Sequence, residues 1–106
     1  MTVRVRVCGR EELAVGQAAR FVVGDVPICL VRTDDGFRAI GDTCSHEDYS
    51  LAEGEVDLEL CEIECWKHGS MFSLETGEPT TLPATRAVPI FPVTVDGDDV
   101  SIEVAP

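Results

Sequence analysis

Basic residues are scarce in this chain of 106 residues. Eight lysines and arginines stand against twenty aspartates and glutamates, which gives a formal net charge of −12. Such a balance repels nucleic-acid phosphates and anionic lipid headgroups, so it argues against both as partners. Long apolar runs are missing as well: none approaches the roughly 18 residues of a membrane span, and the alternating residues 1–7 do not resemble a secretory signal. We therefore expect a soluble cytoplasmic protein.

The acidic residues are concentrated in one window that contains no lysine or arginine. Nine carboxylates fall there: Asp42, Glu47, Asp48, Glu53, Glu55, Asp57, Glu59, Glu62 and Glu64. A field of one sign steers association, so we expect a protein partner with a basic docking face. The alternative is that the charge serves only solubility.

Helical periodicity is nearly absent, apart from one turn expected at residues 10–15. Alternating apolar segments instead predict strands over residues 3–7, 21–24, 27–33, 37–41, 92–95 and 99–104. Hairpin turns are expected at Asp34-Asp35-Gly36 and Asp96-Gly97-Asp98. Many short strands with frequent turns favour a single all-β domain over residues 1–106, built as an antiparallel sandwich or small barrel. Residues 42–84 are expected to form loops on this scaffold, where functional residues tend to concentrate.

Only two histidines occur, and each lies within three residues of a cysteine. They stand in Cys44-Ser45-His46 and Cys65-Trp66-Lys67-His68, with eighteen residues between His46 and Cys65. Thiolate and imidazole are both good ligands for iron and zinc. The remaining cysteines, Cys8, Cys29 and Cys61, lie in strand-like apolar segments, and we expect them to be buried structural residues without disulfides.

Three kinds of site could use the two Cys/His pairs. A structural zinc ion could take all four ligands, although zinc fingers group like ligands in C-x₂₋₄-C and H-x₃₋₅-H segments. A nucleophilic Cys/His pair would need only one of the two segments. A [2Fe–2S] cluster in which two histidines replace two cysteines on one iron uses both segments, and we favour it.

The two segments resemble the Rieske fingerprint, C-x-H followed at a distance by C-x-x-H, here continued by Gly69-Ser70. The resemblance implies one [2Fe–2S] cluster, with Cys44 and Cys65 on the inner iron and His46 and His68 on the outer one. It also implies a Rieske-type antiparallel β-sandwich or barrel with a small cluster-binding subdomain at about residues 42–84. Further segments resemble the ferredoxins of aromatic ring-hydroxylating dioxygenases: residues 37–43, 51–54, 72–77 and 82–86, the last with a proline-bearing loop around Pro83.

Some positions depart from the high-potential Rieske proteins of cytochrome bc complexes. Those proteins carry two further cysteines at the positions of Tyr49 and Lys67, so the resemblance implies loops without a disulfide. Ser70 keeps the serine whose hydroxyl bonds a cluster sulfur, whereas Phe72 replaces a donor tyrosine. Fewer donors and nine nearby carboxylates favour a low reduction potential, roughly −150 mV. Trp66 is expected to pack over its loop and shield it from water.

The resemblance implies an electron carrier that is not itself an enzyme. Such a ferredoxin passes single electrons from an NAD(P)H-dependent flavoprotein reductase to the terminal oxygenase of a dioxygenase system for aromatic hydrocarbon catabolism. The residues agree, since no glycine-rich nucleotide motif is present and both histidines are already used. A monomer suits a diffusing carrier. Two alternatives stay open: a Rieske accessory protein linked to iron–sulfur assembly or nitrite reductase, and a zinc-stabilised interaction module.

Charge steering leads to a kinetic prediction. Neutralising Glu47 or Asp48 is expected to slow reduction of the protein by its electron donor, most strongly at low salt, because screening is weakest there. Stopped-flow reduction over a series of ionic strengths measures this effect. Rates that do not depend on ionic strength would contradict the steering hypothesis.

Overall fold

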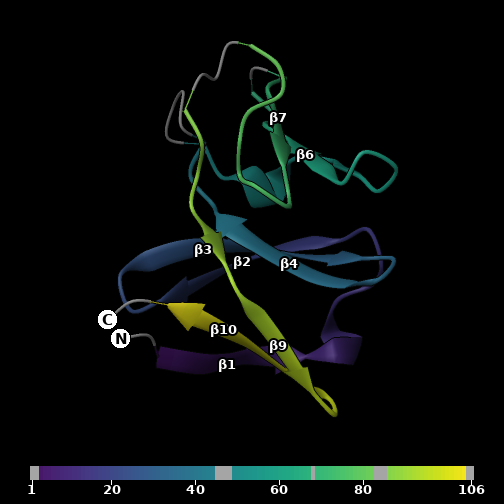
Figure 1. The fold of residues 1–106 in the computed structure, drawn as a ribbon, viewed down its shortest axis with the longest axis vertical. Coiled ribbons are helices and arrows are strands. Elements are labelled where there is room, and N and C mark those ends of the chain that lie inside the picture. Colours follow the sequence, from purple (N-terminus) through teal and green to yellow (C-terminus); the bar gives the residue numbers. More distant parts are fainter. Residues whose placement is uncertain (1–2, 45–48, 68, 83–85, 105–106) are drawn as a thin grey trace.

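A computed structural model describes residues 3–44, 49–67, 69–82 and 86–104. In these ranges the chain forms three antiparallel sheets (Figure 1). The first sheet has the order β1–β10–β9, with β1 (Val3–Gly9), β9 (Val93–Asp96) and β10 (Asp99–Val104). The second has the order β2–β3–β4–β8, with β2 (Ala18–Val23), β3 (Val26–Thr33), β4 (Gly36–Gly41) and β8 (Ile90–Phe91). The third has the order β5–β6–β7, with β5 (Val56–Asp57), β6 (Glu62–Glu64) and β7 (Met71–Ser73).

The β2–β3–β4–β8 sheet is the middle layer of the molecule, and the other two sheets lie on either side of it (Figure 1). Its strand β3 carries the run Ile28-Cys29-Leu30-Val31, and all four residues are 0 % exposed. Successive side chains of a strand point to opposite faces. Ile28 and Leu30 accordingly join the core shared with the β1–β10–β9 sheet, while Cys29 and Val31 join the core beneath the small β5–β6–β7 sheet. Because both faces of β3 are buried, the strand needs a continuous apolar run; an alternating pattern would leave one of the two buried faces polar.

Both expected hairpins form. The turn between β3 and β4 leads into Gly36, and the turn between β9 and β10 contains Gly97 at φ +61°. The expected turn at residues 10–15 appears as a short 3-10 helix, η1 (Arg10–Glu12). A second one, η2 (Leu51–Glu53), follows β4. No helix within the described ranges is long and apolar enough to cross a membrane.

The expectation that residues 42–84 form only loops is wrong, because this part of the chain contains β5, β6 and β7. These strands have two or three residues each, too few for an alternating pattern to stand out. In β6, for example, Ile63 is the single buried residue between two glutamates. The two-residue strand β8 was missed for the same reason.

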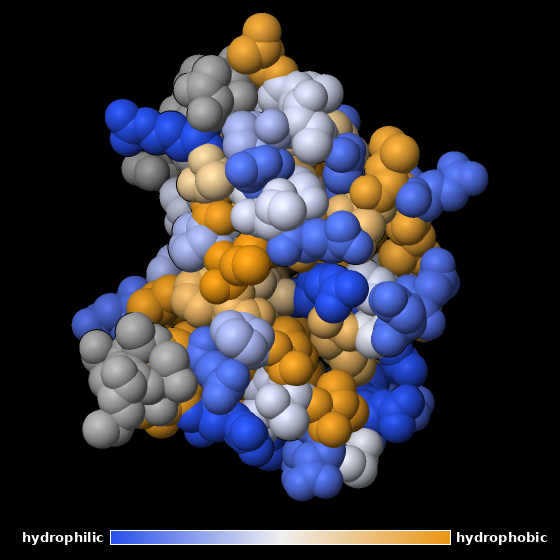
Figure 2. Space-filling view, in the orientation of Figure 1, coloured by the Kyte–Doolittle hydropathy of each residue, from blue (hydrophilic) through white to orange (hydrophobic). Residues whose placement is uncertain are grey.

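The first and last described strands pair from end to end, with Val3 opposite Val104 and Gly9 opposite Asp99, apart from an irregularity between Arg6 and Cys8. They lie at the end of the molecule remote from β6 and β7 (Figure 1). Between the two ends the surface is hollowed, and Figure 2 shows apolar side chains gathered there. This hollow of about 510 Å³ is lined by Leu74 and Glu75 from the small subdomain and by residues of β4, β8 and β9. The hollow therefore lies where the chain that follows β7 meets strands β4, β8 and β9.

Candidate metal centre

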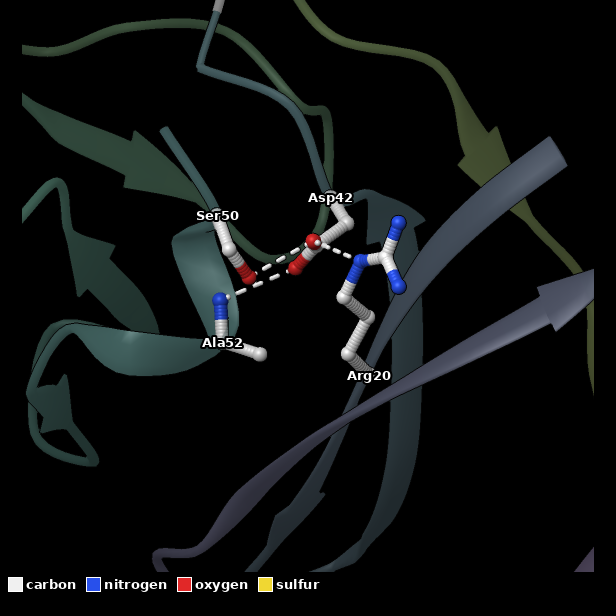
Figure 3. Close-up of polar contacts among 4 residues, drawn as sticks. All are labelled: Arg20, Asp42, Ser50 and Ala52. Atoms are coloured by element: carbon white, nitrogen blue, oxygen red, sulfur yellow. Dashed lines mark hydrogen bonds and ion pairs between the residues drawn. The ribbon is translucent and has the colours of Figure 1, made fainter. Parts of the chain in front are cut away.

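A buried carboxylate lies directly after β4, where the chain leaves the scaffold. Asp42 is only 1 % exposed. Its Oδ2 accepts hydrogen bonds from Arg20 Nε at 3.0 Å and Ser50 Oγ at 2.6 Å, and its Oδ1 accepts one from the Ala52 N–H at 2.9 Å (Figure 3). The Asp42 carbonyl also accepts the Leu51 N–H at 2.6 Å. One residue thus joins β2 to the far end of the segment that contains Cys44.

Asp42 is one of the nine carboxylates of the acidic window, and its anchoring role was not predicted from the sequence. Burial and the pairing with Arg20 remove its carboxylate from the exposed acidic field. Its position in the sequence could have indicated this role, because Asp42 directly follows a predicted strand and stands two positions before Cys44, a candidate ligand. Polar residues that follow a strand directly are often structural anchors of the next loop.

Residues 44–49, the Cys44 loop, are closed at their base by a bridge between Thr43 and Ser50. Inside that bridge the Cys44 N–H donates to the Tyr49 carbonyl at 2.9 Å. His46 belongs to this loop but lies outside the described residues, as do Glu47 and Asp48. The backbone of Cys44 is therefore fixed by the same ladder that closes the loop.

Residues 65–70, the Cys65 loop, connect β6 to β7 and repeat this scheme. The Cys65 N–H donates to the Ser70 carbonyl at 2.7 Å, again five residues further along. The Gly69 N–H donates to the Cys65 carbonyl at 2.9 Å, and Gly69 has φ +77°, a conformation that favours glycine. His68 lies outside the described residues, as does Pro83 of the segment that follows β7. Each loop thus begins with a cysteine held by equivalent hydrogen bonding.

The two cysteines share one buried cluster. Cys44 is 2 % exposed and Cys65 0 % exposed, and both pack with Leu51, Ile63 and Phe72. Neither forms a disulfide. Ionised thiolates are costly in apolar surroundings unless an opposite charge or hydrogen bonds compensate them, and a bound metal supplies that charge.

The surroundings of the two thiols fit an iron–sulfur cluster. A Cβ added to Gly69 would meet no atom within 4 Å, so space remains beside the Cys65 loop for backbone N–H groups to approach sulfur atoms. Ser70 is fully buried next to it. Among the described residues no group of three or more His, Cys, Asp or Glu could hold a metal. The two cysteines predicted as sulfur ligands lie in the described part of the chain, and the histidines predicted as imidazole ligands belong to the same two loops but lie outside the described residues.

The other three cysteines do not belong to this site. Cys8 and Cys29 are buried in the scaffold as expected, and burial raises the pKa of both thiols. Cys61 differs from the expectation: it lies in the turn before β6 at φ +55° and is only half-buried. Burial raises the pKa of its thiol too. None of the three belongs to the Cys44 loop or the Cys65 loop.

Comparison with known proteins defines the class. The Rieske [2Fe-2S] domain family matches residues 3–92, so the chain belongs to this family and holds one Rieske-type [2Fe–2S] cluster. The ferredoxin component of biphenyl 2,3-dioxygenase from Rhodococcus jostii is 36 % identical over 98 residues, which are 92 % of this chain and 90 % of that protein. The chain is an electron carrier of the dioxygenase-ferredoxin type.

Solved structures agree with this assignment. The ferredoxin of carbazole 1,9a-dioxygenase from Nocardioides aromaticivorans superposes with a TM-score of 0.91 at 35 % identity, covering 94 % of this chain and 96 % of that one. A carbazole dioxygenase ferredoxin in complex with its oxygenase superposes with a TM-score of 0.86, also at 35 % identity, covering 94 % and 92 %. An NADH-dependent nitrite reductase small subunit from Mycobacterium tuberculosis shares the fold alone, at 19 % identity and a TM-score of 0.88, covering 100 % and 98 %.

The anchoring role of Asp42 predicts that removing Asp42 and removing Arg20, the two members of one ion pair, lower the free energy of unfolding unequally. Asp42→Ala is expected to lower the free energy of unfolding by about 3 kcal/mol, because a buried N–H loses its acceptor and two further hydrogen bonds to a charged group disappear. Arg20→Ala is expected to cost less, about 1.5 kcal/mol, because the buried carboxylate loses one charge-assisted hydrogen bond but keeps those from Ser50 and Ala52. Urea denaturation of the holoprotein measures both. Equal losses for the two variants would refute this anchoring role.

Proposed function

We propose that this chain carries single electrons from an NAD(P)H-dependent flavoprotein reductase to the terminal oxygenase of an aromatic ring-hydroxylating dioxygenase. The observation that carries the proposal is the match to dioxygenase ferredoxins at 35–36 % identity over more than nine-tenths of the chain. One of the similar ferredoxins is captured in complex with its oxygenase, which supports an oxygenase as acceptor. The reductase is inferred from the need for a donor of single electrons.

We assign Cys44 and Cys65 to the inner iron and His46 and His68 to the outer iron, with the Ser70 hydroxyl donating to a cluster sulfur. The deep burial of both cysteines at the bases of their loops supports the inner position. The bound cluster supplies one-electron redox chemistry. This chain would contribute the ligands and an apolar wall around the two cysteines.

The exposed acids of the small subdomain support a partner with a basic face. Four acids, the exposed Glu55 and Glu59 and the half-buried Asp57 and Glu64, line a hollow of about 510 Å³ together with the apolar side chains of Val56, Leu58 and Met71. Carboxylates around an apolar patch suit a transient encounter, in which long-range attraction brings partners together and a small interface lets them part.

A cytoplasmic monomer is the state we propose for the carrier, acting as an electron-transfer component and not as an enzyme. None of the five cysteines forms a disulfide, as expected in a reducing compartment. The alternative of an accessory protein for nitrite reductase rests on a shared fold only. Membership of the Rieske family favours an iron–sulfur cluster over the zinc-stabilised module.

Reconstituted electron transfer tests the carrier role. Purified holoprotein is combined with NADH, a dioxygenase reductase and candidate terminal oxygenases supplied with their aromatic substrates. Product formation is expected to rise at least about tenfold over the same mixture without the carrier, because direct transfer between reductase and oxygenase lacks a matched docking surface. A carrier that supports nitrite reduction but no oxygenase would move the assignment to the alternative.

Ligand variants test the assignment of the site. His46→Ala and His68→Ala are each expected to abolish the EPR signal of a reduced [2Fe–2S] cluster with mixed nitrogen and sulfur ligation, because the outer iron loses a ligand. Cys61→Ala is the control, since Cys61 is a half-buried thiol outside the site. Loss of the signal in this control, or its survival in both histidine variants, would contradict the assignment.

A further inference from the structure

The two cysteine loops touch each other through aromatic side chains. Tyr49 ends the Cys44 loop and Trp66 is the second residue of the Cys65 loop. Their ring centroids are 5.2 Å apart and the ring planes are inclined by 83°, an edge-to-face arrangement. This geometry places the positive edge of one ring against the negative face of the other, and it is attractive beyond the area buried.

A cation completes the contact. The Lys67 Nζ lies 5.9 Å from the centroid of the Tyr49 ring and 5.9 Å from the centroid of the Trp66 ring. One ammonium group thus faces rings from both loops. An ammonium within about 6 Å of a ring is attracted by its quadrupole. Lys67 is also the first basic residue after the acidic window that begins at Asp42.

These three residues are close in sequence to the sulfur ligands. The Tyr49 carbonyl accepts the Cys44 N–H, and Trp66 follows Cys65 directly. Tyr49 packs against the buried cluster that contains both cysteines, whereas Trp66 is 47 % exposed. The contact therefore runs from the apolar core around the cysteines to the surface, along the seam between the two loops.

We propose that Tyr49, Trp66 and Lys67 form a noncovalent clasp that holds the Cys44 loop against the Cys65 loop. They are positioning residues: the clasp fixes the spacing of the two ligand-bearing segments and limits the entry of water along the seam. The inference rests on the proposed ligand set, because it matters only if both loops hold the same cluster.

Cluster release measures the strength of the clasp. The holoprotein is mixed with excess iron chelator, and the loss of visible absorbance gives a first-order rate. Tyr49→Leu and Trp66→Leu, which keep apolar bulk without the paired rings, are each expected to accelerate release about fivefold. The double variant is expected to release iron no more than about fivefold faster, because either single change already breaks the contact. Rates that multiply to about twenty-five-fold would overturn the clasp.

Two conservative changes and one matched control separate the clasp from general stability. Trp66→Phe and Lys67→Arg keep a ring and a cation, and they are expected to release iron within about twofold of the parent protein. Lys67→Gln is expected to accelerate release.

Arg32→Gln removes another cation–π pair, since the Arg32 guanidinium lies 5.6 Å from the Phe37 ring centroid in the scaffold. This control is expected to lower the melting temperature without changing the release rate; equal acceleration by Lys67→Gln and Arg32→Gln would refute the proposal.

The EPR spectrum of the reduced protein provides a second readout. Variants that open the clasp are expected to broaden the signal, because the two loops then sample a range of spacings, while the conservative variants keep the parent line shape. Failure of the ligand set would appear differently: the parent protein would lack the mixed-ligand signal altogether. An intact parent signal with unbroadened Tyr49→Leu and Trp66→Leu spectra would overturn the clasp alone.

Discussion

The arrangement of the molecule depends on one strand that has no side facing water. Four consecutive residues of β3, from Ile28 to Val31, are completely buried, so both faces of the middle sheet must be covered. The β1–β10–β9 sheet covers one face and the small subdomain covers the other. Because Cys44 and Cys65 belong to the buried cluster on that second face, the hydrophobic burial that stabilises the middle sheet also holds the two proposed sulfur ligands in place. A substitution at Cys29 or Val31 would therefore be expected to affect both the stability of the fold and the positions of Cys44 and Cys65.

The hydrogen bonds of Asp42 fix the relative position of segments that apolar packing only holds together. Hydrophobic packing is not directional and tolerates small shifts, whereas three hydrogen bonds to one buried carboxylate specify a position. The carboxylate connects β2 with both Ser50 and Ala52, so it fixes where the Cys44 loop returns to the scaffold (Figure 3). The Cys65 loop needs no equivalent anchor, since the β6–β7 hairpin sets its two ends directly.

The sequence predicted the scaffold well and the small subdomain less well, for a physical reason. Strands of six to eight residues such as β3 and β10 leave an apolar pattern that can be read, while β5 and β8 have two residues each and leave none. Cys44 and Cys65 were predicted as ligands from ligand chemistry and spacing, which do not depend on strand length. The anchoring role of Asp42 and the Tyr49–Trp66 contact were missed because both join residues distant in sequence, and a single sequence read by itself gives no sign of such pairs.

The pairing of β1 with β10 brings the first and last described residues together at one end, with the cysteine loops at the other (Figure 1). A polypeptide fused at either end would therefore extend away from the loops and leave them open to approach. The same geometry makes the fold portable as a module: it can be tethered to a surface, an electrode or another domain through a single edge of one sheet while its electron-exchanging end stays free. A tether attached at the β1–β10 edge would thus lie at the opposite end of the protein from β6 and β7.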